Sequence, residues 1–430
     1  MVFAVIWRVD PQRVVTGDTA SYENPALALV ETGRFNTGRH KGAKPETLRT
    51  PGYPVFLAGL YTLFGERRDI VVVTQVLLST CTVLLLYGLG FQLSMPTSAL
   101  AAAAFLILDP LSFVYSQLLF SETLFTFVLM LSLWCAIKLL LGGPVWWSGA
   151  FGLSLAAATM IRPIAYYLIV PSIIGLVLYG RIALRWKGRE IATAALLVLI
   201  PWCALVEGWR VRNYTATGSI VFSQIQPYNL LWYRGGGIVA VRDGVSFEDA
   251  RTQIAASLPD MNEWSVADIN ARYVSEGLTL IRDHPLLFLR NQLFGVFKVT
   301  VGPGRSDLDH YVSGIPYAEV SPEAVWFGDG RLVRSVSDHS GSRSVVLYSI
   351  VYTALLYAGV GWGIVAMLYK TTRRAADLFL WGVVIYLIVM AAGPESYARF
   401  RVPVMPILSL YAGCGWDHFK SMLRSTGKRS

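Results

Sequence analysis

The charged side chains next to the apolar segments of this sequence form a small set of carboxylates and arginines. Carboxylates can accept a proton from a hydroxyl nucleophile or hold a divalent cation. Arginines bind phosphate oxygens through a bidentate fork. Ionisable groups at bilayer depth cost roughly 2.5–3.5 kcal/mol on insertion scales, so we treat them as candidates for function. The candidates are Asp18, Glu46, Arg49, Glu122, Arg162, Arg399 and Arg401.

The overall composition is that of a membrane protein. Of the 430 residues, 54% are hydrophobic and 15% are charged, whereas soluble domains carry about 25% charged residues. The mean hydropathy is +0.48. The formal net charge of +9 does not indicate nucleic acid as a partner, because many basic residues lie in short connections that set membrane orientation. The four cysteines lie in apolar segments without metal-ligand spacing, so we expect them to be buried.

Nine apolar segments approach or exceed the ~20 residues that cross a bilayer. They cover residues 70–92, 97–115, 120–141, 146–160, 164–180, 190–208, 346–369, 376–392 and 402–417. The stretch Met1–Val9 is too short to cross a bilayer, and we interpret it as the end of a helix or a short interfacial anchor. The chain is therefore predicted to be an all-α polytopic membrane protein with about 9–10 transmembrane helices, where ~20 apolar residues make one span.

Basic residues predict the orientation of these segments. Three connections rich in Lys and Arg fall on the same side if the segments alternate, and we assign that side to the cytoplasm. They are residues 181–189, 370–374 and 420–429. The first loop, residues 10–69, and the long segment 209–345 then face outward. The candidate carboxylates and arginines come from four separate outer connections, so this topology gathers them at one face of the bundle.

The chain divides into three predicted parts. Residues 1–208 form an N-terminal transmembrane module that carries the first outer loop. Residues 209–345 form a small, mainly helical extracytoplasmic domain, in which apolar residues recur at helical spacing on one face. That face carries Ile269, Tyr273, Leu280 and Ile281. Residues 346–430 form the C-terminal helices and a basic cytoplasmic tail.

Several candidates also have a purely structural interpretation, which the sequence leaves open. Asp18 can cap a helix through its carboxylate. Glu122 follows Ser121 at the start of an apolar segment, where a negative charge suits a helix N-terminus. Arg162 and Arg401 can extend to the membrane interface as snorkelling side chains. Asp109 precedes a proline and can mark a helix end.

The order of these motifs resembles the GT-C superfamily of integral-membrane glycosyltransferases, including the protein O-mannosyltransferases and the lipid A aminoarabinose transferase. The motifs are GDTASYENPALALVETGRF, RTPGYPVFLAGLYTLFG, FSETLFTFVLMLSLW, IRPIAYYLIVP and RFRVPVMPILSLYAG. The resemblance covers most of residues 10–180 and the last outer loop. The family normally has a full helix before its acidic first loop, whereas only Met1–Val9 precede that loop here.

The resemblance implies roles for single residues. Asp18 matches the family's first-loop acidic residue, which acts as a base toward the acceptor, and Glu122 matches its second acidic position. The segment from Arg49 to Tyr53 and Pro54 occupies the place of the family's proline-rich entry to the second span. Arg162 and Arg401 resemble arginines that face the lipid phosphate. We also expect Glu46, Tyr53 and Arg399 to bind substrate.

The resulting hypothesis is an inverting glycosyltransferase that uses a polyprenyl-phosphate sugar as donor. Its active site would face outward from a bacterial inner membrane, and the envelope acceptor is a lipid, a glycan or a protein. The sequence leaves open whether a divalent cation takes part. A transporter or flippase for a lipid-linked saccharide, or an oligosaccharide polymerase or ligase, remains as an alternative.

Overall fold

The structure is a computed structural model, which describes residues 11–93, 95–313, 343–369 and 374–426. Within these ranges the chain is helical, and its one pairing of extended backbone is an isolated bridge between Asn36 and Pro45. Met1–Val9, interpreted above as a helix end or an interfacial anchor, lies outside the described residues. Residues 370–373 and 427–430, which belong to two of the basic connections, also lie outside them.

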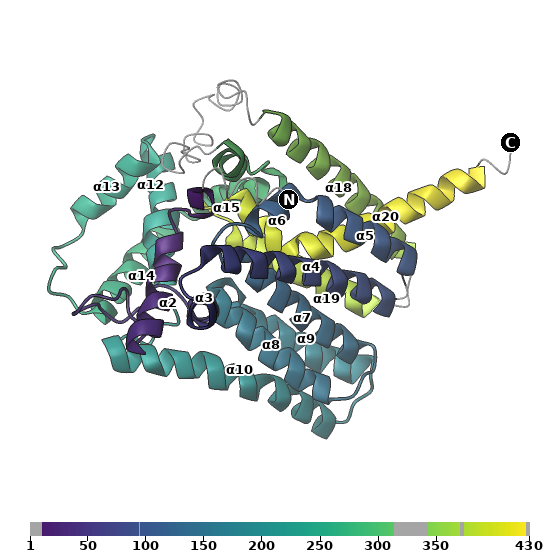
Figure 1. Ribbon diagram of the computed structural model, residues 1–430, viewed down its shortest axis with the longest axis horizontal. Coiled ribbons are helices and arrows are strands. Elements are labelled where there is room, and N and C mark those ends of the chain that lie inside the picture. The colour runs from purple at the N-terminus through teal and green to yellow at the C-terminus, as the bar shows by residue number, and fades with distance from the viewer. Residues whose placement is uncertain (1–10, 94, 314–342, 370–373, 427–430) are drawn as a thin grey trace. The chain divides into compact units, whose positions relative to one another are not determined.

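The predicted apolar segments form helices in the described part of the chain (Figure 1). Six of these are long and apolar enough to cross a membrane: α4 (Arg68–Gln92), α7 (Glu122–Leu140), η2 with α9 (Pro163–Leu168 and Ile169–Ile182), α10 (Gly188–Thr217), α18 (Arg343–Tyr369) and α19 (Arg374–Ala391). The remaining predicted segments correspond to α5 (Pro96–Leu108), α6 (Pro110–Tyr115), α8 (Trp146–Ile161) and α20 (Met405–Thr426). The prediction of an all-α polytopic membrane protein is confirmed.

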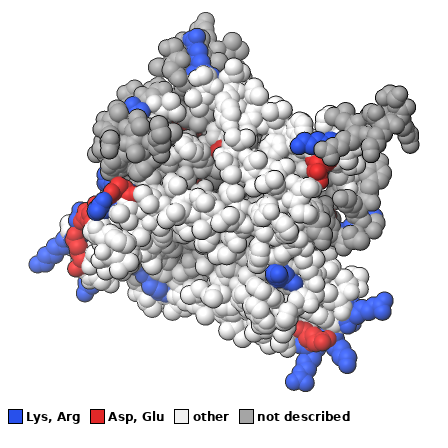
Figure 2. Space-filling model, turned by 45° about the vertical axis from the view of Figure 1, so that its right-hand side comes forward, with Lys and Arg blue, Asp and Glu red and all other residues white. Residues whose placement is uncertain are grey.

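The surface of the long helices is suited to lipid. On α4, Leu77, Leu84 and Phe91 are 60%, 63% and 54% exposed, and their spacing of seven residues places them on one side of the helix. Figure 2 shows that uncharged residues cover most of the described surface in that view. Large apolar side chains in such numbers would be unfavourable in water, so they indicate contact with the bilayer.

Two sequence expectations within these helices need correction. The segment 97–115 is broken at Asp109, where α5 ends and α6 begins with Pro110. Cys135 and Cys414 are buried as expected, but Cys81 and Cys203 are exposed. In a membrane protein the lipid-facing side of a helix is as apolar as its packed side, so hydrophobicity does not distinguish the two.

The chain folds into two compact units. The first comprises residues 1–66, 206–346 and 388–400, and the second comprises residues 67–205, 347–387 and 401–430. In the second unit, α5 packs against α4 and α20, and α7 packs against α4 and α8. Glycines allow the closest of these approaches, because a Cβ on Gly413 of α20 would lie 2.3 Å from the Ser98 carbonyl oxygen of α5.

Helices α18 and α20 offer a matched test of this packing. A Cβ on Gly363 of α18 would lie 2.1 Å from the Tyr411 carbonyl oxygen of α20, whereas a Cβ on Gly361 would meet nothing within 4 Å. We expect Gly363→Ala to cost about 1–3 kcal/mol of stability through overpacking. Gly361→Ala is expected to be neutral or stabilising by up to about 1 kcal/mol. Thermal unfolding of the purified variants measures both, and equal midpoints would contradict the close contact.

The first unit begins with short helices and contains the predicted outer segment. Its helices are η1 (Pro11–Val14), α2 (Thr19–Thr32), α3 (Gly52–Phe64), α11 (Ile225–Tyr228), η3 (Asn229–Gly235), α12 (Gly236–Asp243), α13 (Phe247–Ser257), α14 (Val266–Asp283), α15 (Pro285–Val301), α16 (Arg305–Leu308) and η4 (Asp309–Ser313). The short η6 (Ala398–Val404) follows α19 and begins in this unit. Helix α14 is amphipathic as predicted, since Tyr273 and Leu280 pack against a core that includes Leu231 and Ile254.

Candidate active site

Asp18 lies immediately before α2, where helix capping was the structural alternative for its carboxylate. The side chain makes no capping hydrogen bond to the helix. The start of the helix is instead fixed by Thr16, whose backbone N–H donates to Thr19 Oγ1 at 2.9 Å. Ser21 Oγ donates to the backbone carbonyl of Asp18 at 2.6 Å. The carboxylate of Asp18 is therefore not used as a helix cap.

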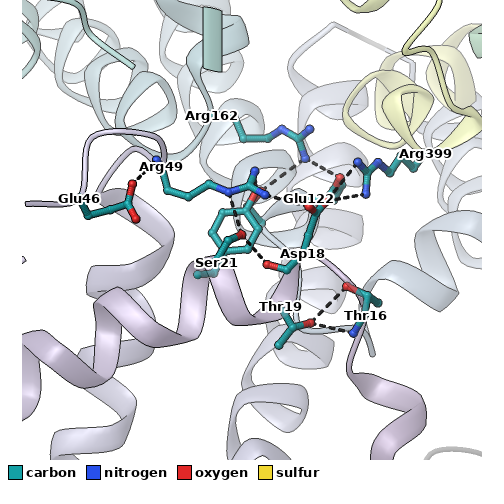
Figure 3. Close-up of polar contacts among 11 residues, drawn as sticks. Thr16, Asp18, Thr19, Ser21, Glu46, Arg49, Glu122, Arg162 and Arg399 are labelled. Carbon is teal, nitrogen blue, oxygen red and sulfur yellow. Dashed lines mark hydrogen bonds and ion pairs between the residues drawn. The ribbon is translucent and has the colours of Figure 1, made fainter. Parts of the chain in front are cut away.

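The Asp18 carboxylate is held between two arginines from distant parts of the sequence (Figure 3). Arg49 Nη2 donates to Asp18 Oδ1 at 2.9 Å, and both terminal nitrogens of Arg399 lie 3.3 Å from Oδ2. Burial raises the pKa of Asp18, but the charges of Arg399 and Arg49 and their hydrogen bonds outweigh this effect and lower it below its usual value. Asp18 is thus an ionised carboxylate at neutral pH, and 36% of its side chain is exposed.

The guanidinium of Arg49 is fixed by the first turn of α2. Its Nε donates to Ser21 Oγ at 2.9 Å, and its Nη1 donates to the Tyr22 hydroxyl at 3.1 Å. The guanidinium carbon also lies 4.3 Å from the centre of the Tyr22 ring, a distance at which a cation is attracted to the ring face. Tyr53 is fully buried and meets the Tyr22 ring edge-on at 5.1 Å, so it supports this ring from within the protein.

The loop that carries Arg49 is shaped by the carboxylate of Glu46. Glu46 Oε1 accepts hydrogen bonds from the backbone N–H groups of Leu48 at 2.6 Å and Arg49 at 3.0 Å. Arg212 of α10 donates to the backbone carbonyls of Glu46 at 2.6 Å and Phe35 at 2.7 Å. Burial raises the pKa of Glu46. The structure therefore places Glu46 where it positions Arg49, and its side chain is 5% exposed.

Arg399 holds Asp18 more loosely than Arg49 does. Its contacts of 3.3 Å exceed the roughly 2.7–2.9 Å of strong charge-assisted hydrogen bonds. The guanidinium carbon lies 5.1 Å from the centre of the Tyr397 ring and 5.2 Å from that of Phe400. These neighbours orient Arg399, while its longer bonds to the carboxylate make it the easier of the two arginines to transfer to another anion.

In the second unit, Glu122 and Arg162 form a separate ion pair. Glu122 is the first residue of α7, and its side chain is 1% exposed. Arg162 Nη1 lies 2.5 Å from Glu122 Oε1 and also donates to Ser121 Oγ at 3.4 Å. Arg162 ends α8, and its side chain is 17% exposed. The buried partner distinguishes Arg162 from a free snorkelling side chain.

Arg401 and Asp109 are both fully buried in the second unit. Asp109 follows the last residue of α5, as its structural interpretation predicted, and its Oδ2 caps the start of α6 by accepting the backbone N–H of Ser112 at 2.8 Å. Arg401 lies close enough to Asp109 and to Tyr357 to interact electrostatically with both. Since no part of Arg401 is exposed, it does not reach the membrane interface as a snorkelling side chain would.

Three contributors to the Asp18 site were missed by the sequence analysis. Ser21 and Tyr22 follow Asp18 by three and four residues, which is the spacing that places side chains on one helix face. That spacing was a usable signal, given Asp18 as a starting point. Arg212 lies far from the loop in sequence, and no local pattern connects it to Glu46.

The carboxylates at these two places already have cationic partners. Asp18 is paired with two arginines in the first unit, and Glu122 with one in the second. Among the described residues, no group of three or more His, Cys, Asp or Glu side chains is placed to hold a metal ion. That Asp18 and the Glu122–Arg162 pair act in one pocket stays a prediction.

Comparison with known proteins gives a family match and a fold match. Residues 46–206 match the family described as dolichyl-phosphate-mannose-protein mannosyltransferase. No curated protein matches the chain. The archaeal oligosaccharyltransferase AglB from Archaeoglobus fulgidus, whose structure holds an inhibitory peptide and a dolichol-phosphate, is similar at a TM-score of 0.52 and 11% identity. The similarity covers 100% of this chain and 51% of AglB, so the chain spans about half of that protein's length.

ArnT from Cupriavidus metallidurans is a more distant structural neighbour. Its apo structure has a TM-score of 0.35 and its complex with undecaprenyl phosphate one of 0.38, each at 15% identity. Both comparisons cover 96% of this chain and 76% of ArnT. The family match and the fold shared with AglB together support the resemblance to the GT-C superfamily.

Proposed function

We propose that this chain, an integral membrane protein with the fold of the GT-C superfamily, transfers a sugar from a polyprenyl-phosphate carrier to an envelope acceptor at the outer face of the membrane. The matched family is named for a dolichyl-phosphate-mannose donor, and AglB was solved with a dolichol-phosphate. The observation that carries the proposal is the ionised, partly exposed carboxylate of Asp18 between two arginines. This arrangement combines a proton acceptor with groups that bind phosphate.

The reaction assigns a separate task to each group. Asp18 accepts the proton of the acceptor hydroxyl while that oxygen attacks the anomeric carbon of the donor sugar. The bond between the anomeric carbon and the phosphate oxygen breaks, and polyprenyl phosphate leaves with the bonding electrons. Attack from the face opposite the leaving group inverts the anomeric configuration. Arg399 stabilises the negative charge of the departing phosphate.

Arg49 binds Asp18 at a shorter distance than Arg399 does, and this difference suggests how donor binding prepares the proton transfer. A donor phosphate competes with Asp18 for Arg399, whose two contacts are long, while the three nitrogens of Arg49 stay bound near α2. When Arg399 turns to the phosphate, Asp18 loses one of the two positive charges that lower its pKa. Its pKa then rises toward the ordinary value, and the carboxylate becomes a stronger base.

The pH dependence of the reaction tests this electrostatic relation. Asp18 has a lowered pKa, so its ion pairs are fully present above about pH 3.9, the usual Asp value, and are lost as pH falls through the lower folded-state pKa. We expect Arg399→Gln to raise the Asp18 pKa and move the acidic limb of kcat/KM to higher pH. Arg242→Gln removes an exposed partner of Asp243 and serves as the control. An acidic limb that stays in place in Arg399→Gln would contradict the assignment.

The function itself is tested with purified protein in proteoliposomes and polyprenyl-phosphate sugars labelled in the sugar. We expect the labelled sugar to pass to an acceptor in an envelope extract, with an equal amount of polyprenyl phosphate formed. Label that crosses the bilayer while still attached to its carrier would instead establish a transporter. Transfer of preassembled oligosaccharide chains, with no use of single sugars, would establish a polymerase or ligase.

A further inference from the structure

A pocket of about 190 Å³ lies in the first unit behind the loop that carries Arg49. It is lined by Leu48, Gln224, Tyr228, Val266, Ile269, Asn270 and Tyr273. Pockets for drug-sized ligands measure roughly 300–1,000 Å³, so this one is suited to a single ring. Its residues come from the loop before α3, from α11 and its preceding residue, and from α14.

The pocket lining has the chemistry of a site for a neutral ring with several hydroxyl groups. None of the residues that line it is charged. Gln224 and Asn270 carry amides, which both donate and accept hydrogen bonds. Tyr228, Tyr273 and Ile269 supply apolar surface. A pyranose combines hydroxyl groups around its edge with apolar C–H faces, so it can use both kinds of wall.

The aromatic and amide walls are held in place by their neighbours. The Tyr273 ring meets the Trp232 ring edge-on at 5.7 Å. Arg251 Nη2 donates to the Tyr228 hydroxyl at 2.9 Å. Asn270 Nδ2 donates to Ser219 Oγ at 3.0 Å. Such fixed side chains reduce the entropy cost of binding a ligand.

The pocket is connected directly to the Asp18 site through the chain. Leu48 lines the pocket, and the next residue, Arg49, binds Asp18. Consecutive Cα atoms are about 3.8 Å apart, so a ligand that contacts Leu48 in the pocket lies next to the backbone of Arg49. The backbone N–H of Gln224 donates to the Thr47 carbonyl at 2.9 Å, which fixes the same loop to the pocket wall.

We propose that this pocket binds one uncharged pyranose ring of the substrates, an inference that rests on the proposed glycosyl transfer. The ring belongs either to a glycan acceptor or to the donor, since both present the same hydroxyl and C–H chemistry. Occupation of the pocket places a sugar beside the loop of Arg49 and thereby orients a substrate toward Asp18. The pocket is thus a specificity site, separate from the groups that transfer the proton and bind the phosphate.

Binding is tested by saturation-transfer NMR on the full chain in nanodiscs. The probes are the methyl pyranosides of mannose, glucose, galactose and N-acetylglucosamine, with N-acetyltyrosinamide as a peptide-like competitor. We expect at least one glycoside to receive saturation at its ring protons. Ile269→Trp fills the pocket without removing a polar group and is expected to reduce that signal at least fivefold. Leu278→Trp, at a 53% exposed position of the same helix, is the matched control.

The outcome also identifies the source of the ring. A bound glycoside that gains labelled sugar from the donor occupies the acceptor's place, whereas one that raises the KM for the donor competes with the donor's sugar. The proposal is overturned if no glycoside binds, if Ile269→Trp leaves binding unchanged, or if only N-acetyltyrosinamide occupies the pocket. Pocket-dependent glycoside binding without any sugar transfer would refute the proposed function and leave the pocket assignment intact.

Discussion

Asp18→Asn is expected to lower kcat for sugar transfer by about 100- to 10,000-fold, the usual loss when a general base is removed. Asparagine keeps the size of the side chain and can still accept a hydrogen bond from Arg49. It carries no charge and cannot hold the proton of the acceptor hydroxyl. Initial rates of label transfer with purified protein, at saturating donor, measure the effect. The donor KM is expected to change less than kcat and to fall rather than rise, because the donor phosphate then no longer competes with a charged carboxylate for Arg399.

The matched control for this variant is Asp69→Asn. Asp69 also pairs with an arginine, Arg67, at 2.6 Å, but the arginine side chain is 60% exposed and the pair lies at the start of α4. We expect Asp69→Asn to retain the rate of the unmodified protein. Full turnover by Asp18→Asn would exclude Asp18 as the base. An equal loss in both variants would indicate a general effect of removing a carboxylate.

The parts of this site that the sequence predicted are those specified by local chemistry. Asp18 and Arg49 both lie in the predicted first outer loop, residues 10–69, and their acidic and basic types predicted proton transfer and phosphate binding. The residue pair Asp109 and Pro110 suggested a helix end, but the segment 97–115 was still predicted as one span, and the structure breaks it there. The contribution of Arg399 was predicted from the sidedness of the loops, but its bond to Asp18 depends on tertiary structure.

The burial of single side chains could not be predicted from the local sequence. Tyr53 and Arg401 were predicted to bind substrate, which stays a prediction, but their full burial was not foreseen. For an arginine or a tyrosine near the end of an apolar segment, the neighbouring sequence does not show whether the side chain faces a cavity or the packed interior. The difference is decided by partners such as Tyr22 and Tyr357, which come from other helices. Glu46 was likewise predicted to bind substrate, and its bonds to the backbone of its own loop, which place it beside Arg49, could not be foreseen from local sequence.

Glu122→Gln is expected to destabilise the second unit by about 3–5 kcal/mol, the cost of removing one partner from a buried ion pair. Glu122 is 1% exposed, so its loss leaves the charge of Arg162 without a carboxylate at 2.5 Å. Arg162→Gln should cost a similar amount, and the double variant should cost less than the sum because both single variants break the same ion pair. Removing the exposed Arg67–Asp69 pair should cost less than about 1 kcal/mol.

Thermal unfolding and transfer rates of the same four variants separate the two interpretations of Glu122 that the sequence left open. A purely structural pair predicts that the fully folded fraction of Glu122→Gln transfers sugar at the normal rate. A catalytic Glu122 predicts a rate at least 100-fold lower in that fraction, within the range for lost acid–base catalysis. In that case the double variant would regain stability but not activity. A Glu122→Gln variant as stable as Asp69→Asn and fully active would contradict both roles, because a buried carboxylate at the start of α7 would then be dispensable.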